Sequence, residues 1–191
     1  SKDLCMMPRL DKILELGLLP NKDAYKSNYY SYIMNGLMTQ LTRIELGNDI
    51  EESHMRNRQL IAKWCLENGA EDNVISIEKI NGKSYVKIND YDKLRELFGK
   101  LLAEVQRIKS EGDYEAGKAL VEKYAVKVDI ELHKEVLDRY KKLNLAPYKG
   151  FVNPKFTLVE DENGNITDVA VTYNENYDEQ MLRYSKDYSA L

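Results

Sequence analysis

The sequence predicts a mainly α-helical protein of the α+β class, with two short β-hairpins in different parts of the chain. Most of the 191 residues fall in segments whose apolar positions recur with helical spacing. Alternation with period two surrounds Asn81-Gly82, and a second hairpin sequence turns at Asn163-Gly164. A stretch rich in proline and glycine, NLAPYKGFVNP, separates the helical part from the second hairpin.

Two helices are expected in the N-terminal part of the chain. The first covers residues 10–19 and stops at Pro20, and the second opens at Asn21 and runs through YKSNYYSYIMNGLMTQLTRIEL. Tyrosines recur along the second helix at helical spacing. They could line a cleft, but the pattern is more typical of aromatic packing with hydroxyl groups at the rim.

The next segment, EESHMRNRQLIAKW at residues 51–64, begins as a charged helix and continues as a core helix. We expect Asp49 to cap this helix and Glu52 to complete a capping box. The pair Asn68-Gly69 is a signal for its end.

A β-hairpin is predicted at about residues 74–88, where VISIEKINGKSYVKI alternates around Asn81-Gly82. Asp90 then caps a third long helix, and two further helical segments cover residues 114–124 and 130–143.

A second hairpin, FTLVEDENGNITDVAVTY, follows the proline-rich stretch, and a helix at residues 177–188 ends the chain. These changes in character divide the chain into a helical part, residues 1–147, and a β-containing part, residues 148–191.

Composition excludes several classes of function. The net charge of -4 gives no electrostatic support to nucleic-acid binding, and no apolar run is long enough to span a membrane. Cys5 and Cys65 form neither a disulfide framework nor a zinc pattern, and Cys65 is expected to be buried and reduced. HExxH, P-loop and GxSxG motifs are all absent.

The two histidines differ in their surroundings. His133 lies between charged neighbours and is interpreted as a solvated helix residue. On a helical wheel, His54 and Arg58 share one stripe with Ile61 and Cys65, so they point to the core side at the open end of their helix. A separate stripe of the same helix is expected to face solvent and consists of Arg56, Lys63 and Glu67.

Two interpretations of this stripe remain open. In the structural one, Arg58 pairs with a buried carboxylate and His54 donates to a backbone carbonyl. In the functional one, an imidazole and a guanidinium form the wall of a cleft, where they suit a developing oxyanion and a carboxylate or carbonyl ligand.

Three collinear segments carry a resemblance to a known family. The block NGLMTQLTRIELGNDIEESHMRNRQLIAKWCLENGA resembles the C-terminal half of the dipeptidyl peptidase III family, the M49 zinc exopeptidases. Its bacterial members carry a similar E-[AS]-H-M-R-N-R-Q-L-I-A stretch. The runs VQRIKSEGDYEAGKALVEKYA and YKGFVNPKFTLVED resemble later parts of the same family, in the same order.

The resemblance implies a two-lobed enzyme with a wide cleft, in which one helical lobe holds zinc and the other contains a β-barrel. The family's zinc ligands come from H-E-x-x-G-H and E-E-x-R-A-[DE], and neither motif is in this sequence. We therefore expect the chain to be the portion C-terminal to all zinc ligands, with no zinc of its own and no activity alone. Its partners would be a peptide substrate and the missing N-terminal part.

Only a few site residues carry over from the family. His54 matches the histidine that faces the scissile peptide and helps to stabilise the transition state. Arg58 matches an arginine with a supporting or substrate-contacting role, and Lys149 matches a basic residue at the crossover between the lobes. Lys63 occupies a position that can be arginine, but the wheel puts it on the solvated side.

A different class of function is compatible with the same residues. The chain could be a noncatalytic helical interaction domain that uses the peptidase scaffold, with its hairpins and acidic surface as partner contacts.

Overall fold

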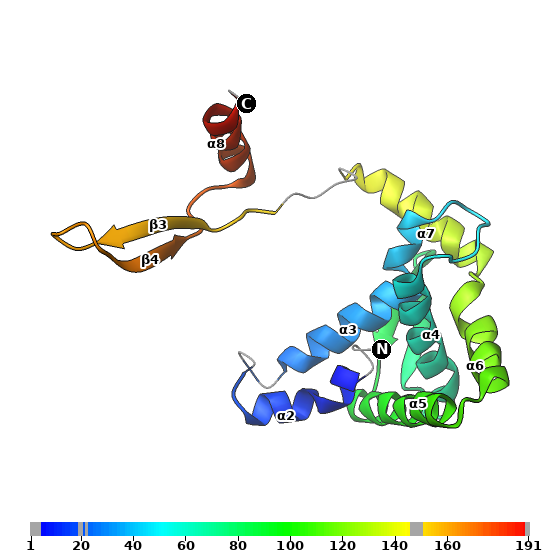
Figure 1. Ribbon diagram of the computed structural model, residues 1–191. Helices are drawn as coiled ribbons and strands as arrows, with labels where there is room; N and C mark the ends of the chain where they lie inside the picture. Colours follow the sequence, from blue (N-terminus) through cyan, green and yellow to red (C-terminus); the bar gives the residue numbers. More distant parts are fainter. Residues whose placement is uncertain (1–4, 19–20, 22, 146–150, 190–191) are drawn as a thin grey trace. The chain divides into compact units, whose positions relative to one another are not determined.

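The computed structural model describes residues 5–18, 21, 23–145 and 151–189. The chain divides into two compact units, unit 1 (Ser1–Asn144) and unit 2 (Leu145–Leu191). The predicted mainly helical α+β class is confirmed, and Figure 1 shows the elements coloured along the chain. Unit 1 contains η1 (Met7–Arg9), α2 (Leu10–Glu15), α3 (Ala24–Leu37), η2 (Thr39–Arg43), α4 (Ser53–Asn68), β1 (Ile75–Ile80), β2 (Lys83–Ile88), α5 (Tyr91–Glu111), α6 (Tyr114–Val121), η3 (Glu122–Val126) and α7 (Ile130–Leu143). Unit 2 contains β3 (Lys155–Glu160), β4 (Ile166–Thr172) and α8 (Tyr177–Tyr188).

The core of unit 1 lies where α3, α4 and α5 pack together. Tyr29 and Ile33 of α3 and Phe98 of α5 are fully buried. The rings of Tyr29 and Phe98 meet edge to face with centroids 5.1 Å apart, which is a favoured aromatic geometry. The Tyr29 hydroxyl donates to the backbone oxygen of Met7 at 2.6 Å, so its polar end is satisfied. The prediction of a packed tyrosine stripe is confirmed here.

The second predicted helix is shorter than expected. It ends at Leu37, and a 3-10 turn, η2, follows Met38. The last carbonyls of a helix lack intrahelical partners, and the carbonyl of Gly36 receives a hydrogen bond from the side-chain amide of Gln40 instead. The tighter turn therefore replaces the end of the predicted helix.

The first hairpin forms where the sequence predicted it. Its turn residues Asn81 and Gly82 both have positive φ, 50° and 75°, as the expected type I′ turn requires. The strands pair antiparallel, with Ile77 opposite Val86.

The hairpin is attached to α7 through Glu135, whose two carboxylate oxygens accept from the backbone N–H and the hydroxyl of Ser84. Arg139 of α7 donates to the carbonyl of Ser84 at 2.7 Å and to Glu135 at 3.2 Å. These contacts give the short sheet a support that two isolated strands do not have in water.

Replacing Glu135 by glutamine is expected to make the free energy of unfolding of unit 1 fall less steeply as pH is lowered. Burial acts to raise the pKa of Glu135, but the hydrogen bonds from Ser84 and Arg139 outweigh it and lower the pKa below its ordinary value of 4.5. A carboxylate with a lowered pKa stabilises the folded state above its unfolded value, and this contribution is lost as pH falls through the folded pKa.

Urea unfolding of both proteins from pH 7 to pH 3 measures the effect. The free energy of unfolding of Glu135→Gln should be lower than wild type at pH 7, by about 2 kcal/mol, and the difference should shrink below pH 4.5. Parallel curves at all pH values would show that the carboxylate makes no such contribution.

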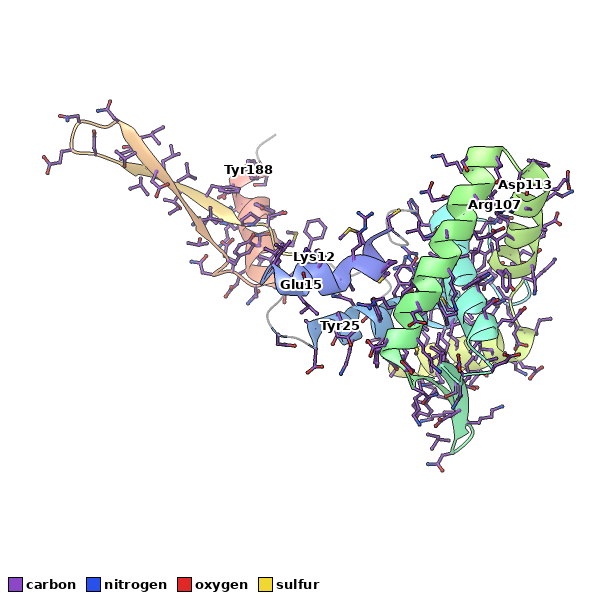
Figure 2. The ribbon with its side chains drawn as sticks, turned by 90° about the horizontal axis from the view of Figure 1, so that it is seen from below. Lys12, Glu15, Tyr25, Arg107, Asp113 and Tyr188 are labelled. Atoms are coloured by element: carbon purple, nitrogen blue, oxygen red, sulfur yellow. The ribbon has the colours of Figure 1, made fainter. Side chains whose placement is uncertain are left out.

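The junction between α5 and α6 is held by Arg107, seen beside Asp113 in Figure 2. Its guanidinium donates to Asp113 at 3.0 Å and to Glu104 and Glu111 on its own helix. Asp113 also accepts from the backbone of Ala116, so it caps α6 while it pairs with α5.

Unit 2 is a twisted hairpin followed by α8. Phe156 pairs with Val171 and Leu158 with Val169, so four apolar side chains share one face of the hairpin, and all four are exposed within the described residues. The buried amide of Gln180 in α8 exchanges two hydrogen bonds with the backbone of Asn153. This attaches the helix to the segment just before β3. The predicted second hairpin and C-terminal helix are confirmed.

Candidate functional site

Helix α4 begins one residue after the N-cap Glu52. This side chain accepts hydrogen bonds from the backbone N–H groups of His54 at 2.8 Å and Met55 at 2.9 Å. These bonds, led by that from His54, lower the pKa of Glu52. The prediction that Asp49 caps the helix is wrong, because Asp49 forms an ion pair with Lys127 instead.

One side of α4 lies in unusually close contact with α3. A Cβ atom added to Gly36 would stand 2.5 Å from the backbone oxygen of Arg58 and 2.7 Å from the Cβ of Ala62. The absence of a side chain at Gly36 therefore sets how closely the two helices approach. The buried Gln40 adds a bridge at the same crossing, because its amide group donates to the backbone oxygens of Gly36 and Met55.

Of the stripe of α4 that was predicted to face solvent, Glu67 is exposed, but Arg56 and Lys63 are half-buried. Gln59 is buried and donates to the backbone oxygens of Tyr124 and Lys127 at the end of η3. Lys63 donates to the same Lys127 oxygen, and burial lowers the pKa of its amine. Arg56 and Lys63 were misassigned because their long side chains reach backbone oxygens of neighbouring segments, those of Ile50 and Lys127. Glu67, the third residue of the stripe, forms an ion pair with Lys123.

The loop that leads into α4 is fixed at several points. The backbone N–H of Ile50 donates to the oxygen of Val126, and the carbonyl of Ile50 accepts from the Nε of Arg56. These contacts join the residues before α4 to its first turn and to η3. The start of the helix is thus held from outside as well as by its own cap.

His133 is the buried counterpart of His54, and its prediction as a solvated residue is wrong. It is 1% exposed, and its Nε2 lies 3.1 Å from the backbone oxygens of both Leu41 and Ile44. These carbonyls lie at the end of η2, where the Leu41 oxygen accepts one backbone hydrogen bond from Ile44 and, like the Ile44 oxygen, has hydrogen-bonding capacity left. The imidazole takes up that hydrogen-bonding capacity, so His133 serves the fold of unit 1.

His54 and Arg58 differ from these hydrogen-bonded neighbours. They lie one turn apart on α4; His54 is exposed and Arg58 half-buried. Neither side chain makes a hydrogen bond or an ion pair within the described part of the chain. The structural interpretation requires an ion pair from Arg58 to a buried carboxylate and a hydrogen bond from His54 to a backbone carbonyl. Neither bond is made within those residues. Ile61 and Cys65, which continue the stripe, are buried as predicted.

Asn57, which lies between His54 and Arg58 in sequence, uses one of its hydrogen-bond donors within the fold. Asn57 donates from its amide nitrogen to the hydroxyl of Tyr32 on α3 at 3.2 Å. The exposed start of α4 therefore presents an imidazole that can donate a hydrogen bond and a guanidinium that can bind a carboxylate or carbonyl. Together these groups can hold a peptide main chain.

The third predicted site residue, Lys149, lies outside the described residues. The structure therefore brings together two of the three predicted site residues, His54 and Arg58, on one helix.

A cleft of about 610 Å³ lies elsewhere in unit 1, between β1–β2 and α7. Lys63, Ser84 and Glu135 are in its wall, but His54 and Arg58 are not. Sequence periodicity did not reveal this cleft, because it depends on how the hairpin packs against α7. Among its many polar lining groups, Ser84 and Glu135 bond to each other, so part of their hydrogen-bonding capacity already serves the fold.

No three His, Cys, Asp or Glu side chains cluster as a metal site among the residues that the structure describes. Burial raises the pKa of the Cys65 thiol, so this cysteine stays protonated and is a poor metal ligand. Over the same described ranges, no helix has the length and apolar character needed to cross a lipid bilayer.

Comparison with known proteins gives one family. The model of peptidase family M49 matches residues 3–182, which is nearly the whole chain. A search among curated proteins found no match.

Proposed function

The chain belongs to peptidase family M49, and we propose that it forms one wall of the substrate cleft of a zinc-dependent dipeptidyl peptidase. The family is one of metallopeptidases, so the reaction class is peptide hydrolysis. The finer activity that we propose is the release of dipeptides from the N-terminus of short peptides. It rests on the resemblance of EESHMRNRQLIA, residues 51–62, to bacterial dipeptidyl peptidase III.

One observation carries the assignment of the site. Cap, bridge and backbone contacts fix the start of α4, yet the side chains of His54 and Arg58 make no hydrogen bond or ion pair among the described residues. Side chains that start from a fixed backbone and keep their hydrogen-bonding capacity free are available to bind a ligand. In our proposal the His54 imidazole donates to the carbonyl oxygen of the peptide bond being cleaved, where negative charge develops. Arg58 binds a carbonyl or carboxylate of the same peptide.

The residues of this chain do not fit the zinc ion that the family uses. The described residues offer no cluster of metal ligands, and the full sequence contains neither H-E-x-x-G-H nor E-E-x-R-A-[DE]. Our proposal places the zinc ligands in a preceding part of the same protein and assigns no step of the zinc chemistry to this chain. The isolated chain is then inactive.

The two parts of the chain are proposed to serve different lobes. Residues 1–147 would complete the helical zinc lobe, and residues 148–191 would cross to the other lobe, with Lys149 meeting the C-terminal side of the peptide. The exposed apolar face of the β3–β4 hairpin supports this proposal, since a two-stranded hairpin with such a face is stable only when other strands or helices cover it.

Product analysis tests the proposed function. The intact protein, purified with zinc, is incubated with peptides of four to eight residues, and the products are identified by mass spectrometry. We expect N-terminal dipeptides from the intact protein and no cleavage by the isolated 191-residue chain. Release of single amino acids or internal cleavage would contradict the dipeptidyl peptidase assignment, and cleavage by the isolated chain would contradict the placement of the zinc ligands.

A further inference from the structure

A buried amide joins the two helices on which the candidate site depends. Gln40 is 2% exposed and lies in η2, just after α3. Its Nε2 donates to the Gly36 oxygen at 3.2 Å and to the Met55 oxygen at 3.1 Å. Gly36 lies in the last turn of α3, and Met55 in the first turn of α4, directly after His54.

The orientation of this amide is fixed by chemistry. Both of its neighbours are carbonyl oxygens, which can only accept, so the NH₂ group must face them. The Oε1 atom then points away, and within the described residues it is buried without a hydrogen-bond partner. A buried acceptor without a partner carries a cost, which the two hydrogen bonds of the NH₂ group offset.

We infer that Gln40 is a positioning residue for His54, an inference that rests on the proposed function. The glycine contact at Gly36 sets the distance between α3 and the backbone of Arg58, and the amide bridge sets where the first turn of α4 stands relative to α3. Gln40 touches no substrate. It acts by keeping the His54 imidazole where the peptide carbonyl is bound.

Gln59 provides a matched comparison. It is also a buried glutamine whose Nε2 donates to two backbone oxygens, those of Tyr124 and Lys127. Its bridge ties α4 to η3 and not to the α3–α4 crossing. Loss of either bridge should lower stability, whereas only the loss of the Gln40 bridge should displace His54 relative to α3.

The test uses the intact protein with Gln40→Met, Gln59→Met and His54→Ala, and the double variant Gln40→Met with His54→Ala. We expect Gln40→Met to lower kcat about 10- to 100-fold, since small misplacements of a catalytic group have effects of this size. KM should change less than about twofold, because the substrate contact of Arg58 is retained. Gln59→Met should have an unfolding midpoint similar to that of Gln40→Met. Its kcat should nevertheless stay within about threefold of wild type.

The double variant separates positioning from general destabilisation. If Gln40 acts through His54, Gln40→Met should change kcat by less than about twofold once His54 is alanine. An equal loss in both backgrounds overturns the inference. A normal loss in His54→Ala beside an unchanged Gln40→Met overturns this inference alone, whereas unchanged kcat in His54→Ala overturns the proposed role of His54 and this inference with it.

A second variant, Gln40→Glu, covers the case in which the methionine variant does not fold. Protonated glutamic acid can donate to one of the two carbonyls, but the ionised form can donate to neither. Its kcat relative to wild type should therefore rise as pH is lowered through the pKa of the new carboxyl group. A ratio that does not change with pH overturns the inference.

Discussion

Replacing His54 by alanine in the intact peptidase is expected to lower kcat about 100- to 1,000-fold, the range found when one donor to a developing oxyanion is removed. The loss follows from removing the imidazole that the exposed first turn of α4 presents without any partner of its own in the described part of the chain. Zinc content and the unfolding midpoint should stay at wild-type values, since the side chain holds neither metal nor neighbouring structure in our account. Steady-state kinetics and metal analysis measure these quantities.

Glu51→Ala is the matched control for this variant. Glu51 is an exposed neighbour that lies before the N-cap Glu52, so its removal leaves the helix start intact. Its kcat should stay within about twofold of wild type. If His54→Ala were as active as Glu51→Ala, the role assigned to His54 would be wrong.

Replacing Gly36 by alanine should be among the most destabilising single changes in unit 1. The new methyl group would stand 2.5 Å from the Arg58 oxygen, and a backbone atom cannot swing away as a side chain does. The helices α3 and α4 must separate, and overpacking of this kind costs about 1–3 kcal/mol, occasionally more. Because the displaced oxygen belongs to Arg58, the affinity for peptide should fall in the intact enzyme as well. Urea unfolding gives the stability, and KM reports on peptide binding.

Gly99 in α5 supplies the contrast for the same substitution. A Cβ at Gly99 meets nothing within 4 Å, and its φ is not in the left-handed region. Gly99→Ala should therefore stabilise the protein by about 0.5–1 kcal/mol through helix propensity. If the two variants had equal stabilities, the close contact of α3 with α4 would not hold in solution.

Much of the fold could be predicted because its signals are local. Asn81-Gly82 sets the turn of the first hairpin by its own backbone preference, and Asp90 caps α5 with its own side chain, which accepts from the Lys93 backbone. The C-terminal helix was predicted for the same reason, since Asn176 and Glu179 form a complete capping box.

The errors came from contacts between distant residues. Asp49 has the right chemistry for a cap, but Lys127, 78 residues away, takes its carboxylate. His133 has charged neighbours in sequence, but its imidazole is buried, with two backbone oxygens at the end of η2 as hydrogen-bond partners. Helical periodicity describes one helix alone and contains no information about the carbonyls of its neighbours.

The candidate site was predictable in part. The helical wheel placed His54 and Arg58 together, but it could not decide between packing and function. That question depends on contacts in three dimensions, and neither side chain makes a hydrogen bond or an ion pair within the described residues. The glutamine bridges that hold α4 were not predicted, because Gln40 and Gln59 are 19 positions apart and each is satisfied by backbone oxygens of other segments.

A structure of the intact protein with a slowly cleaved peptide bound would show whether the start of α4 is a wall of the substrate cleft. We predict that a ring nitrogen of His54 lies within about 3.2 Å of a main-chain carbonyl oxygen of the peptide at the cleavage position, with the Arg58 guanidinium against the same peptide. A peptide bound on another face, with the start of α4 open to solvent, would contradict the proposal that this helix is a wall of the substrate cleft.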